Sequence, residues 1–181
     1  MKVMFISDIH GSSKYCRKAI EKFEKHKCDM LVILGDILYH GPRNELPDGY
    51  DCKEVIKMLN PLAAKIVAVR GNCDSEVDQM VLDFPMRSDY SILNLDGHKF
   101  FLTHGHLFDE ENMPPLKKGD IFAYGHIHKP VAKCDNDGIY IINPSSVSLP
   151  KKGERSFGLY EDDCFRIYTF ENELVKEINF D

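Results

Sequence analysis

The sequence predicts an α/β fold in which two β-sheets pack face to face and the helices lie outside them. Three observations support this prediction. The first half of the chain alternates short apolar strands with amphipathic helices, the second half is rich in strands with mainly antiparallel signals, and no linker separates the halves. Because the chain has 181 residues, we expect a single domain over 1–181.

Apolar runs predict three strands in the first half, at 3–6, 31–34 and 66–69. Each run is apolar at every position, which is typical of strands that are buried on both faces of a parallel sheet. Helical patterns separate the runs, so the first half has the alternating order of strands and helices that builds such a sheet.

Two helices are predicted between these strands. The first begins at Ser12 or Ser13, either of which could cap it, and repeats apolar residues at helical spacing. The second begins after Asp51, because Glu54 three residues later completes a pattern typical of a capping box. Pro61 marks the end of the second helix.

The second half is predicted to consist mainly of strands. Asp96 and Gly97 stand between two strand-like segments and predict a hairpin with a two-residue turn. Further strands are expected where turn residues separate apolar runs, at 121–124, 139–142, 157–161 and 165–170. We expect the strands of this half to form the second of the two sheets.

Polar side chains stand where five of these strands end. They are carboxylates, imidazoles and one amide: Asp8, His10, Asp36, Asn72, His104, His126 and His128. One such element alone is weak evidence, because Asp, Asn and His also serve as caps and turn residues. The carboxyl ends of neighbouring strands meet at one rim of an open α/β sheet, however, and this rim is where such sheets bind ligands. We therefore expect the set to converge on one site.

The chemistry of this set predicts a metal centre. Carboxylate, imidazole and amide ligands without thiolates suit Mn²⁺, Fe²⁺ or Zn²⁺ in a dinuclear hydrolytic centre rather than a cysteine-rich structural zinc site. The sequence contains no glycine-rich dinucleotide loop, no Walker loop and no serine nucleophile elbow. Metal-dependent hydrolysis is therefore the chemistry that the motifs favour.

Five short motifs occur in the order SDIHG, GDIL, GNCD, THGH and GHIH, and they resemble the motifs of the calcineurin-like metallophosphoesterases. Segments 40–44 and 71–80 are similar to the bacterial YfcE-type phosphodiesterases of that superfamily. The resemblance covers essentially the whole chain. It implies a four-layer α-β-β-α sandwich of the metallo-dependent phosphatase type, formed by a single metallophosphoesterase domain.

The resemblance also implies how the ligands divide between two divalent metal ions. The first ion would be held by Asp8, His10 and His128, with Asp36 as the bridge to the second ion. The second site would be completed by Asn72, His104 and His126. A hydroxide that bridges the ions would attack phosphorus and cleave a P–O ester bond of a phosphodiester. The implied ion is Mn²⁺ foremost, with Fe²⁺, Zn²⁺, Co²⁺ or Ni²⁺ as alternatives.

Some residues are implied to act on the substrate. Asn72 and His104 would take part in catalysis beside the ions. Cys73 stands where many relatives have a histidine that assists the leaving group or binds phosphate, and it matches the subgroup that favours diesters over monoesters. Arg43 follows the Asp36 motif and could either grip a phosphate or be an ordinary surface arginine, and the sequence leaves both interpretations open.

Two further positions are left open by the sequence. His106 stands two residues beyond the His104 ligand position and could line the substrate pocket. Ser145 lies in an Asn-Pro-Ser-Ser segment where relatives commonly have glycine in place of the first serine. The geometry of that turn is therefore not predicted, although the metal ligands are unaffected.

Composition and charge exclude several classes of protein. Lys and Arg total 23 and Asp and Glu total 29, so the net charge is −6. An acidic chain without a basic stripe argues against a nuclease or another partner of nucleic-acid polymers. Bound metal ions would reconcile the acidic chain with a small anionic phosphodiester.

The sequence also bears on location. No apolar run approaches the ~20 residues that span a membrane. The scattered cysteines indicate reduced thiols and a cytoplasmic location.

One alternative from another class remains. Retromer-type subunits resemble this fold but serve as scaffolds with an impaired metal site. All seven ligand positions carry competent residues here, which favours an enzyme over a catalytically inert scaffold or interaction module. Relatives also suggest a homodimer or a higher homo-oligomer.

Overall fold

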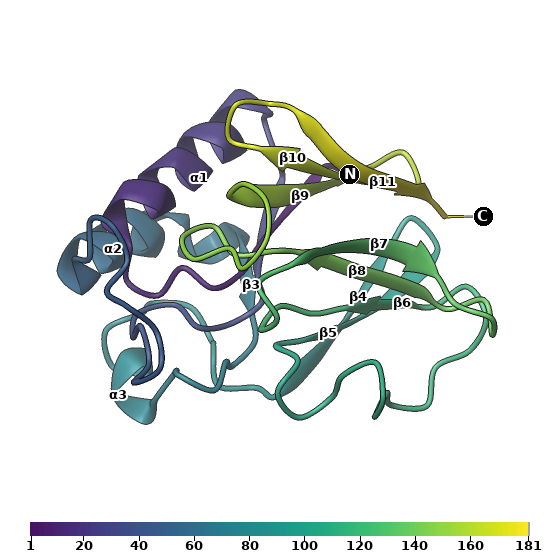
Figure 1. Ribbon diagram of the computed structural model, residues 1–181, viewed down its shortest axis with the longest axis horizontal. Coiled ribbons are helices and arrows are strands. Elements are labelled where there is room, and N and C mark those ends of the chain that lie inside the picture. Colours follow the sequence, from purple (N-terminus) through teal and green to yellow (C-terminus); the bar gives the residue numbers. More distant parts are fainter. Residues whose placement is uncertain (181) are drawn as a thin grey trace.

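The computed structural model describes residues 1–180, which form two β-sheets packed against each other (Figure 1). The first sheet has six strands in the order β11-β10-β9-β1-β2-β3, and the second has five in the order β4-β5-β6-β8-β7. Both sheets contain parallel and antiparallel pairs. The predicted α/β fold with two facing sheets is confirmed.

The strands predicted in the first half form the parallel part of the first sheet. They are β1 (Val3–Ile6), β2 (Met30–Ile33) and β3 (Ile66–Ala68), paired side by side in parallel. Alternate residues of β1 point to opposite faces of the sheet: Met4 packs toward the helices, whereas Phe5 packs toward the second sheet. Burial on both faces explains why the run is apolar at every position.

The last three strands join the first sheet rather than the second, which corrects the expected division of the chain. They are β9 (Ser156–Glu161), β10 (Cys164–Thr169) and β11 (Leu174–Asn179), and β9 pairs antiparallel with β1. Strand β2 covers only one edge of β1, and the return of the chain after residue 155 covers the other. Pairing between segments so distant in sequence leaves no trace in a local hydrophobic pattern. Strand β11 was not predicted, because it is a largely exposed edge strand.

The second sheet starts with the predicted hairpin. Strands β4 (Tyr90–Leu95) and β5 (His98–Thr103) pair antiparallel around Asp96 and Gly97, whose φ angles of 51° and 93° suit a tight hairpin turn. The remaining strands are β6 (Ile121–Ala123), β7 (Pro130–Cys134) and β8 (Tyr140–Pro144). β6 pairs parallel with both β5 and β8, so the mainly antiparallel expectation is wrong for the centre of this sheet. Strand β7, half-exposed at the edge, was not predicted.

The helices begin where their capping residues predict. Ser12 caps α1 (Ser13–Lys25) by accepting the N–H of Tyr15, which decides between the two candidate serines. Asp51 caps α2 (Cys52–Leu59), and a 3₁₀ helix (Asn60–Lys65) containing Pro61 continues from it. The four-residue helix α3 (Glu76–Gln79) follows β3 and was not predicted. Within residues 1–180, no helix has the length and apolar character needed to cross a bilayer.

The elements stack in layers (Figure 1). Helices α1 and α2 cover the outer face of the first sheet, with Phe23 and Val55 in the core between them. A second core lies between the sheets and includes Phe5 and Phe100. The outer face of the second sheet is covered by the segment 104–120, of which Phe108 packs on the strands. Within the described residues this outermost layer is a loop rather than a helix.

Candidate metal centre

The structure brings together all seven residues that the sequence singled out as metal ligands. A polar side-chain atom of each lies no more than 3.3 Å from a polar side-chain atom of another. Six of them lie within four residues after the ends of β1, β2, β3, β5 and β6, and His128 lies two residues beyond His126. The expected convergence of strand ends on one site is therefore what the fold produces.

The first cluster consists of Asp8, His10 and His128. Nε2 of His10 lies 3.3 Å from Nε2 of His128, and Oδ1 of Asp8 lies 3.0 Å from Nε2 of His128. The other ring nitrogens, Nδ1 of His10 and of His128, lie 2.9 and 2.6 Å from the carbonyl oxygens of Tyr39 and Leu149. A carbonyl oxygen only accepts hydrogen bonds, so each neutral imidazole carries its proton on Nδ1 and turns a lone pair inward.

The second cluster repeats this arrangement with Asn72, His104 and His126. Nδ1 of His104 donates to the carbonyl oxygen of Leu34 at 2.6 Å, which leaves Nε2 of the neutral ring as an acceptor. That Nε2 lies 3.1 Å from Oδ1 of Asn72 and 3.3 Å from Nδ1 of His126. The backbone N–H of His126 also donates to Oδ2 of Asp8, which connects the two clusters.

Asp36 lies between the two clusters. Its Oδ2 is 3.3 Å from Nε2 of His104 and 3.7 Å from Nε2 of His10. Its Oδ1 accepts the backbone N–H of Cys73 at 2.8 Å, so one oxygen is occupied and the other faces both clusters. Sγ of Cys73 also lies near enough to His10 and Asp36 to join a metal site, a possibility that the sequence analysis did not raise.

The chemistry of the ligand atoms shows that the site fits divalent cations. Oδ1 of Asp8 is buried and accepts no hydrogen bond, although it is surrounded by imidazole nitrogens. Buried acceptors without a donor are costly, and their mutual repulsion is relieved by a cation placed among them. The cluster Asp8, His10 and His128 and the cluster Asp8, Asp36 and His104 each bring three ligand atoms within metal-binding reach. These buried Asp and His clusters are suited to hold metal ions.

The ligands hold unusual protonation states before a cation arrives. Burial alone would raise the pKa of Asp8, but its contacts with His10 and His128 outweigh burial and hold the pKa well below its usual range. Burial alone would lower the pKa of His104, but the contact with Asp36 and the charge of Asp8 raise it to about 9. A proton on His104 therefore substitutes for a cation in the metal-free protein.

We expect metal uptake to release this proton. Because His104 stays protonated up to a pKa of about 9, a cation that binds its Nε2 below that pH must displace the proton. Apparent metal affinity should therefore rise about tenfold per pH unit for each proton displaced. Calorimetric titration of the chelator-stripped protein with Mn²⁺ in two buffers of different ionisation enthalpy counts the protons. A count of zero at neutral pH would contradict this account.

The same pKa shift sets the pH dependence of the metal-free fold. The folded pKa of His104 lies above its ordinary value of 6.5, so protonation stabilises the fold fully below 6.5. This contribution is lost as the pH rises through about 9. The free energy of unfolding of the stripped protein should therefore fall across that window, which urea titration at several pH values measures.

Strained backbone gathers at this site. The φ angles of Asp8, His10, Asp36, His126 and His128 lie between 49° and 62°, in the left-handed region that side-chain-bearing residues rarely adopt. Each such residue costs roughly 1–2 kcal/mol, and such strain clusters at functional sites. The left-handed turns let the chain reverse directly after a strand while the ligand side chain points into the site.

Two glycines allow the loops to approach this closely. A Cβ on Gly71 would lie 2.1 Å from Oδ1 of Asp36, and a Cβ on Gly125 would lie 1.9 Å from Oγ of Ser7. Neither distance is possible for real atoms, so any larger residue would push the loop away from a ligand. These glycines are the ones in the Gly-Asn-Cys-Asp and Gly-His-Ile-His motifs.

Asp74 fixes the backbone around the shared ligand. Its Oδ2 accepts the N–H groups of Asp36 and Gly71 at 2.8 and 2.7 Å, and its Oδ1 accepts that of Ile37 at 2.8 Å. Burial raises the pKa of Asp74 to about 6.

Two serines fix the backbone of the first cluster. The hydroxyls of Ser146 and Ser148 donate to the carbonyl oxygen of Asp8 at 2.8 and 2.9 Å. The sequence analysis missed these serines, because short polar residues in a loop carry no signal of which distant carbonyl they bind.

We expect Ser145→Gly to stabilise the protein by about 1 kcal/mol. Ser145 has a φ of 69°, and its buried hydroxyl makes no hydrogen bond in the described structure. Glycine removes both costs but loses more chain entropy on folding, which limits the gain. Urea unfolding measures the change, and Ser145→Ala separates the two effects because it removes only the hydroxyl. A glycine variant less stable than the alanine variant would contradict the strain argument.

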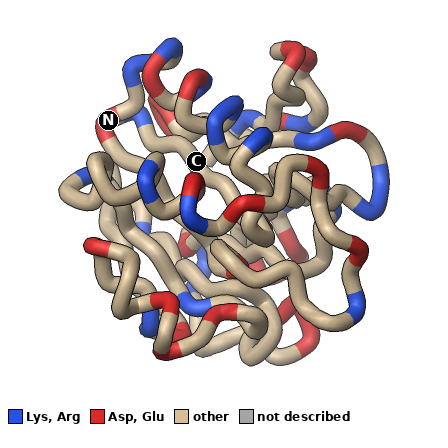
Figure 2. Tube along the Cα trace, turned by 90° about the vertical axis from the view of Figure 1, so that its left-hand side faces the viewer, with Lys and Arg blue, Asp and Glu red and all other residues tan. Residues whose placement is uncertain are grey.

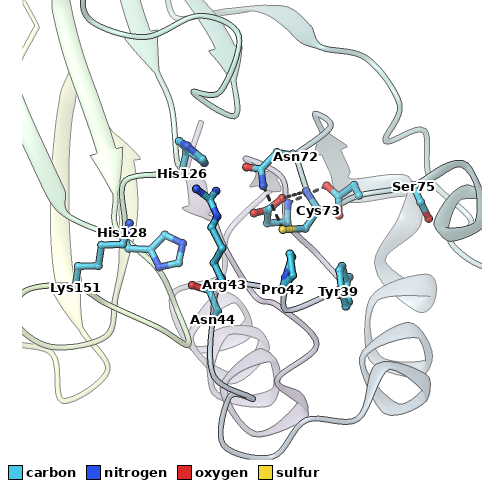
Figure 3. A pocket seen from close by; sticks show the side chains of 13 residues that line it. Tyr39, Pro42, Arg43, Asn44, Asn72, Cys73, Ser75, His126, His128 and Lys151 are labelled. Carbon is cyan, nitrogen blue, oxygen red and sulfur yellow. Dashed lines mark hydrogen bonds between the residues drawn. The ribbon is translucent and has the colours of Figure 1, made fainter.

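A pocket of about 680 Å³ opens over the clusters (Figure 3). Among its lining residues are Asn72, Cys73, His126 and His128 from the predicted site, together with Arg43 and Lys151. His104 is fully buried and His106 is half-buried, and neither lines this pocket. Lys151 was missed by the sequence analysis, since it lies in a lysine-containing loop without a motif.

Comparison with known proteins agrees with this geometry. Residues 1–163 match the sequence profile of the calcineurin-like phosphoesterase superfamily domain. The chain belongs to this superfamily. It is 47% identical over 176 residues to the phosphodiesterase YfcE of Escherichia coli, an alignment that covers 97% of this chain and 95% of that protein. A solved structure of the E. coli phosphoesterase superposes with a TM-score of 0.98 at 45% identity, covering 100% of both chains. The chain is thus a homologue of YfcE, and the predicted metallophosphoesterase fold is confirmed.

Two further comparisons give lower similarity. A phosphodiesterase of Methanocaldococcus jannaschii is 31% identical over 171 residues, which cover 90% of this chain and 94% of that protein. The solved structure of Vps29 from Entamoeba histolytica with Zn²⁺ has a TM-score of 0.66 at 20% identity, over 100% of both chains. At that identity the likeness to Vps29 concerns the fold alone.

Proposed function

We propose that this member of the calcineurin-like superfamily is a divalent-metal-dependent phosphodiesterase that hydrolyses a P–O ester bond in a small phosphodiester. One observation carries the proposal: imidazole, carboxylate and amide ligand groups converge at the pocket, and five of the seven residues that provide them have left-handed backbone. The 47% identical E. coli relative, which is named a phosphodiesterase, supports the same chemistry.

The proposed ligands divide as the two clusters do. Asp8, His10 and His128 hold one ion and Asn72, His104 and His126 hold the other, with Asp36 shared between them. Mn²⁺ is the foremost candidate, and Fe²⁺, Zn²⁺, Co²⁺ and Ni²⁺ suit the same ligand types. The complete burial of His104 supports a part in holding an ion rather than in touching the substrate.

Two divalent ions held in this way would offset the charge on phosphate oxygens and lower the pKa of a water, so that its oxygen bonds to phosphorus as the bond to the leaving oxygen breaks. The side chains of the pocket then act on the substrate. Arg43 rises from the loop after β2 and points its guanidinium toward His126 (Figure 3), where it can donate two hydrogen bonds to a phosphate. Asn72 presents its amide to the same space, besides its proposed role as a ligand.

Cys73 takes no part in proton transfer in this proposal. Burial and the negative charge of Asp36 raise the pKa of its thiol to about 12, so the side chain is neutral and protonated at physiological pH. A neutral thiol provides neither a cation for a second phosphate charge nor an acid for the leaving group. This supports a diester rather than a monoester as the substrate.

The alternatives fit the site less well. A scaffold or interaction module needs neither buried acceptors nor left-handed backbone at five of the seven ligand positions. A nuclease needs a basic surface, whereas the net charge is −6 and both signs are interspersed along the chain (Figure 2). All six cysteines are unpaired, which is in keeping with the proposed cytoplasmic location.

The test is a matrix of metals against substrates on the chelator-stripped protein. We expect hydrolysis of an aryl phosphodiester to depend on added metal, with Mn²⁺ foremost, and to exceed hydrolysis of the monoester with the same leaving group. Cyclic and linear dinucleotides extend the series. Full activity in the presence of chelator would overturn the proposal.

A further inference from the structure

Two basic side chains in the pocket have no acidic partner. Arg43 and Lys151 both line it, and neither forms an ion pair with any residue in 1–180. The neighbouring cleft, of about 470 Å³, provides the contrast. It is lined by Arg70 and Arg87, and each of them is paired with a carboxylate. The positive charges of the neighbouring cleft are therefore neutralised by carboxylates, whereas those of Arg43 and Lys151, in the pocket above the metal clusters, are not.

The backbone that carries Lys151 is tied to the metal cluster. The N–H of Lys151 donates to the carbonyl oxygen of His128 at 3.0 Å, and the carbonyl oxygen of Leu149 accepts Nδ1–H of His128 at 2.6 Å. The segment that orients the first-cluster histidine therefore also sets the position of the lysine. Figure 3 shows Lys151 beside His128, on the other side of the pocket from Cys73 and Ser75.

A second anchor holds the far end of this loop. Nε of Arg155 donates to the carbonyl oxygen of Ser148 at 3.0 Å, and its guanidinium lies 4.1 Å from the centre of the Tyr15 ring. This distance is suitable for a cation–π contact. The backbone of the loop is thus fixed on both sides of Lys151, which places the base of this side chain at the pocket.

The two free cations exceed what a simple phosphodiester requires. Such a diester carries one negative charge, and Arg43 points toward His126, over the second cluster (Figure 3). Lys151 lies beside the first cluster and remains available for a separate group of the substrate. A lysine ammonium is a compact point charge that binds phosphate without fixed orientation.

We propose that Lys151 selects small phosphodiesters that carry a second phosphate group away from the bond that is hydrolysed. This inference rests on the proposed phosphodiesterase function and specifies its substrate class. Because Lys151 is solvent-exposed, its preference is modest in size and is screened by salt.

The test compares two substrates that differ only in the second charge. They are the p-nitrophenyl ester of thymidine monophosphate and the same ester with an additional phosphate on the sugar. For the Mn²⁺-loaded protein we expect kcat/KM to be about 3- to 5-fold higher for the substrate with the second phosphate. In Lys151→Ala this ratio should fall to about 1 through a rise in KM, and Lys151→Arg should restore it. Lys152→Ala is the matched control, since Lys152 does not line the pocket, and it should leave the ratio unchanged.

A binding measurement separates failure of this inference from failure of the proposed function. We would titrate thymidine bisphosphate and thymidine monophosphate into the wild-type and Lys151→Ala proteins. Tighter binding of the bisphosphate that is lost in the variant supports the role of Lys151, even if neither ester is hydrolysed. An unchanged preference in Lys151→Ala, in rate or in binding, overturns it. Absence of hydrolysis by the metal-loaded wild type would instead count against the phosphodiesterase itself.

Discussion

Asp36→Asn is expected to remove both proposed metal ions together and to lower kcat/KM for a phosphodiester by about 10³-fold, because bound ions contribute several kcal/mol to the transition state. Asparagine keeps the oxygen that accepts the N–H of Cys73 at 2.8 Å, so the loop should hold its shape. The lost oxygen is the one 3.3 Å from Nε2 of His104 and 3.7 Å from Nε2 of His10. In the variant an amide N–H can donate to these nitrogens and occupy the place of a cation.

Metal content after removal of unbound ions decides this prediction. His128→Ala provides the comparison, because His128 contacts only the first cluster and its loss should reduce mainly one ion. Asp83→Asn is the control for the change of carboxylate to amide, since Asp83 is exposed and does not line the pocket. It should retain both ions and full activity. Two fully retained ions in Asp36→Asn would refute the assignment of Asp36 as the shared ligand.

Local sequence patterns predicted the strands and helices of the first half of the chain, because the residues of each element carry the signal of its own burial or capping. The fully apolar runs around β1 and β2 indicate strands that are buried on both faces. Ser12 and Asp51 begin their helices because their side chains accept hydrogen bonds from free N–H groups of the first turn. What the patterns could not predict is long-range pairing. Strand β9 pairs with β1 because that edge of β1 stays open after the parallel strands have formed. No local sequence pattern in either strand indicates this pairing.

The candidate site was predictable for a different reason. Six of the seven ligands stand next to a glycine or just after a strand, so motif and position coincide, as at Gly35 with Asp36. The supporting atoms were not predictable, because many of them are backbone carbonyls such as those of Leu34 and Leu149, which any residue would provide. Lys151 belongs to the same group: its place in the pocket comes from a backbone bond to His128 rather than from its own sequence context.

Cys73→His is expected to raise monoester turnover relative to diester turnover by about 10- to 100-fold, as partial recovery of general acid–base assistance. A Cβ built on Gly41 would lie 2.8 Å from Sγ of Cys73, so the loop closes one side of the thiol. A larger imidazole must therefore extend into the pocket, where the substrate would lie. There it can carry a positive charge and donate a proton, neither of which the neutral thiol provides.

Substrate charge explains why the ratio should change rather than both rates equally. A monoester dianion brings one more negative charge than a diester monoanion, and its leaving group gains more from a nearby proton. The advantage of Cys73→His should fade as the pH rises above the ordinary imidazole pKa of ~6.5. Cys73→Ser and Cys73→Ala should leave the ratio near its original value, because neither introduces a cation.

The competing explanation is that Cys73 is simply a small side chain that fits against the Gly41 loop. Both explanations predict some loss of absolute rate in Cys73→His, so only the ratio of kcat/KM for a monoester and a diester with the same leaving group separates them. Metal content must be measured alongside, because Sγ of Cys73 lies within reach of His10 and Asp36, and the new side chain can disturb them. If the variant retains two ions and the ratio does not move, the packing explanation stands. If the ratio rises at low pH and returns as the imidazole deprotonates, the thiol at position 73 is what biases this site toward diesters.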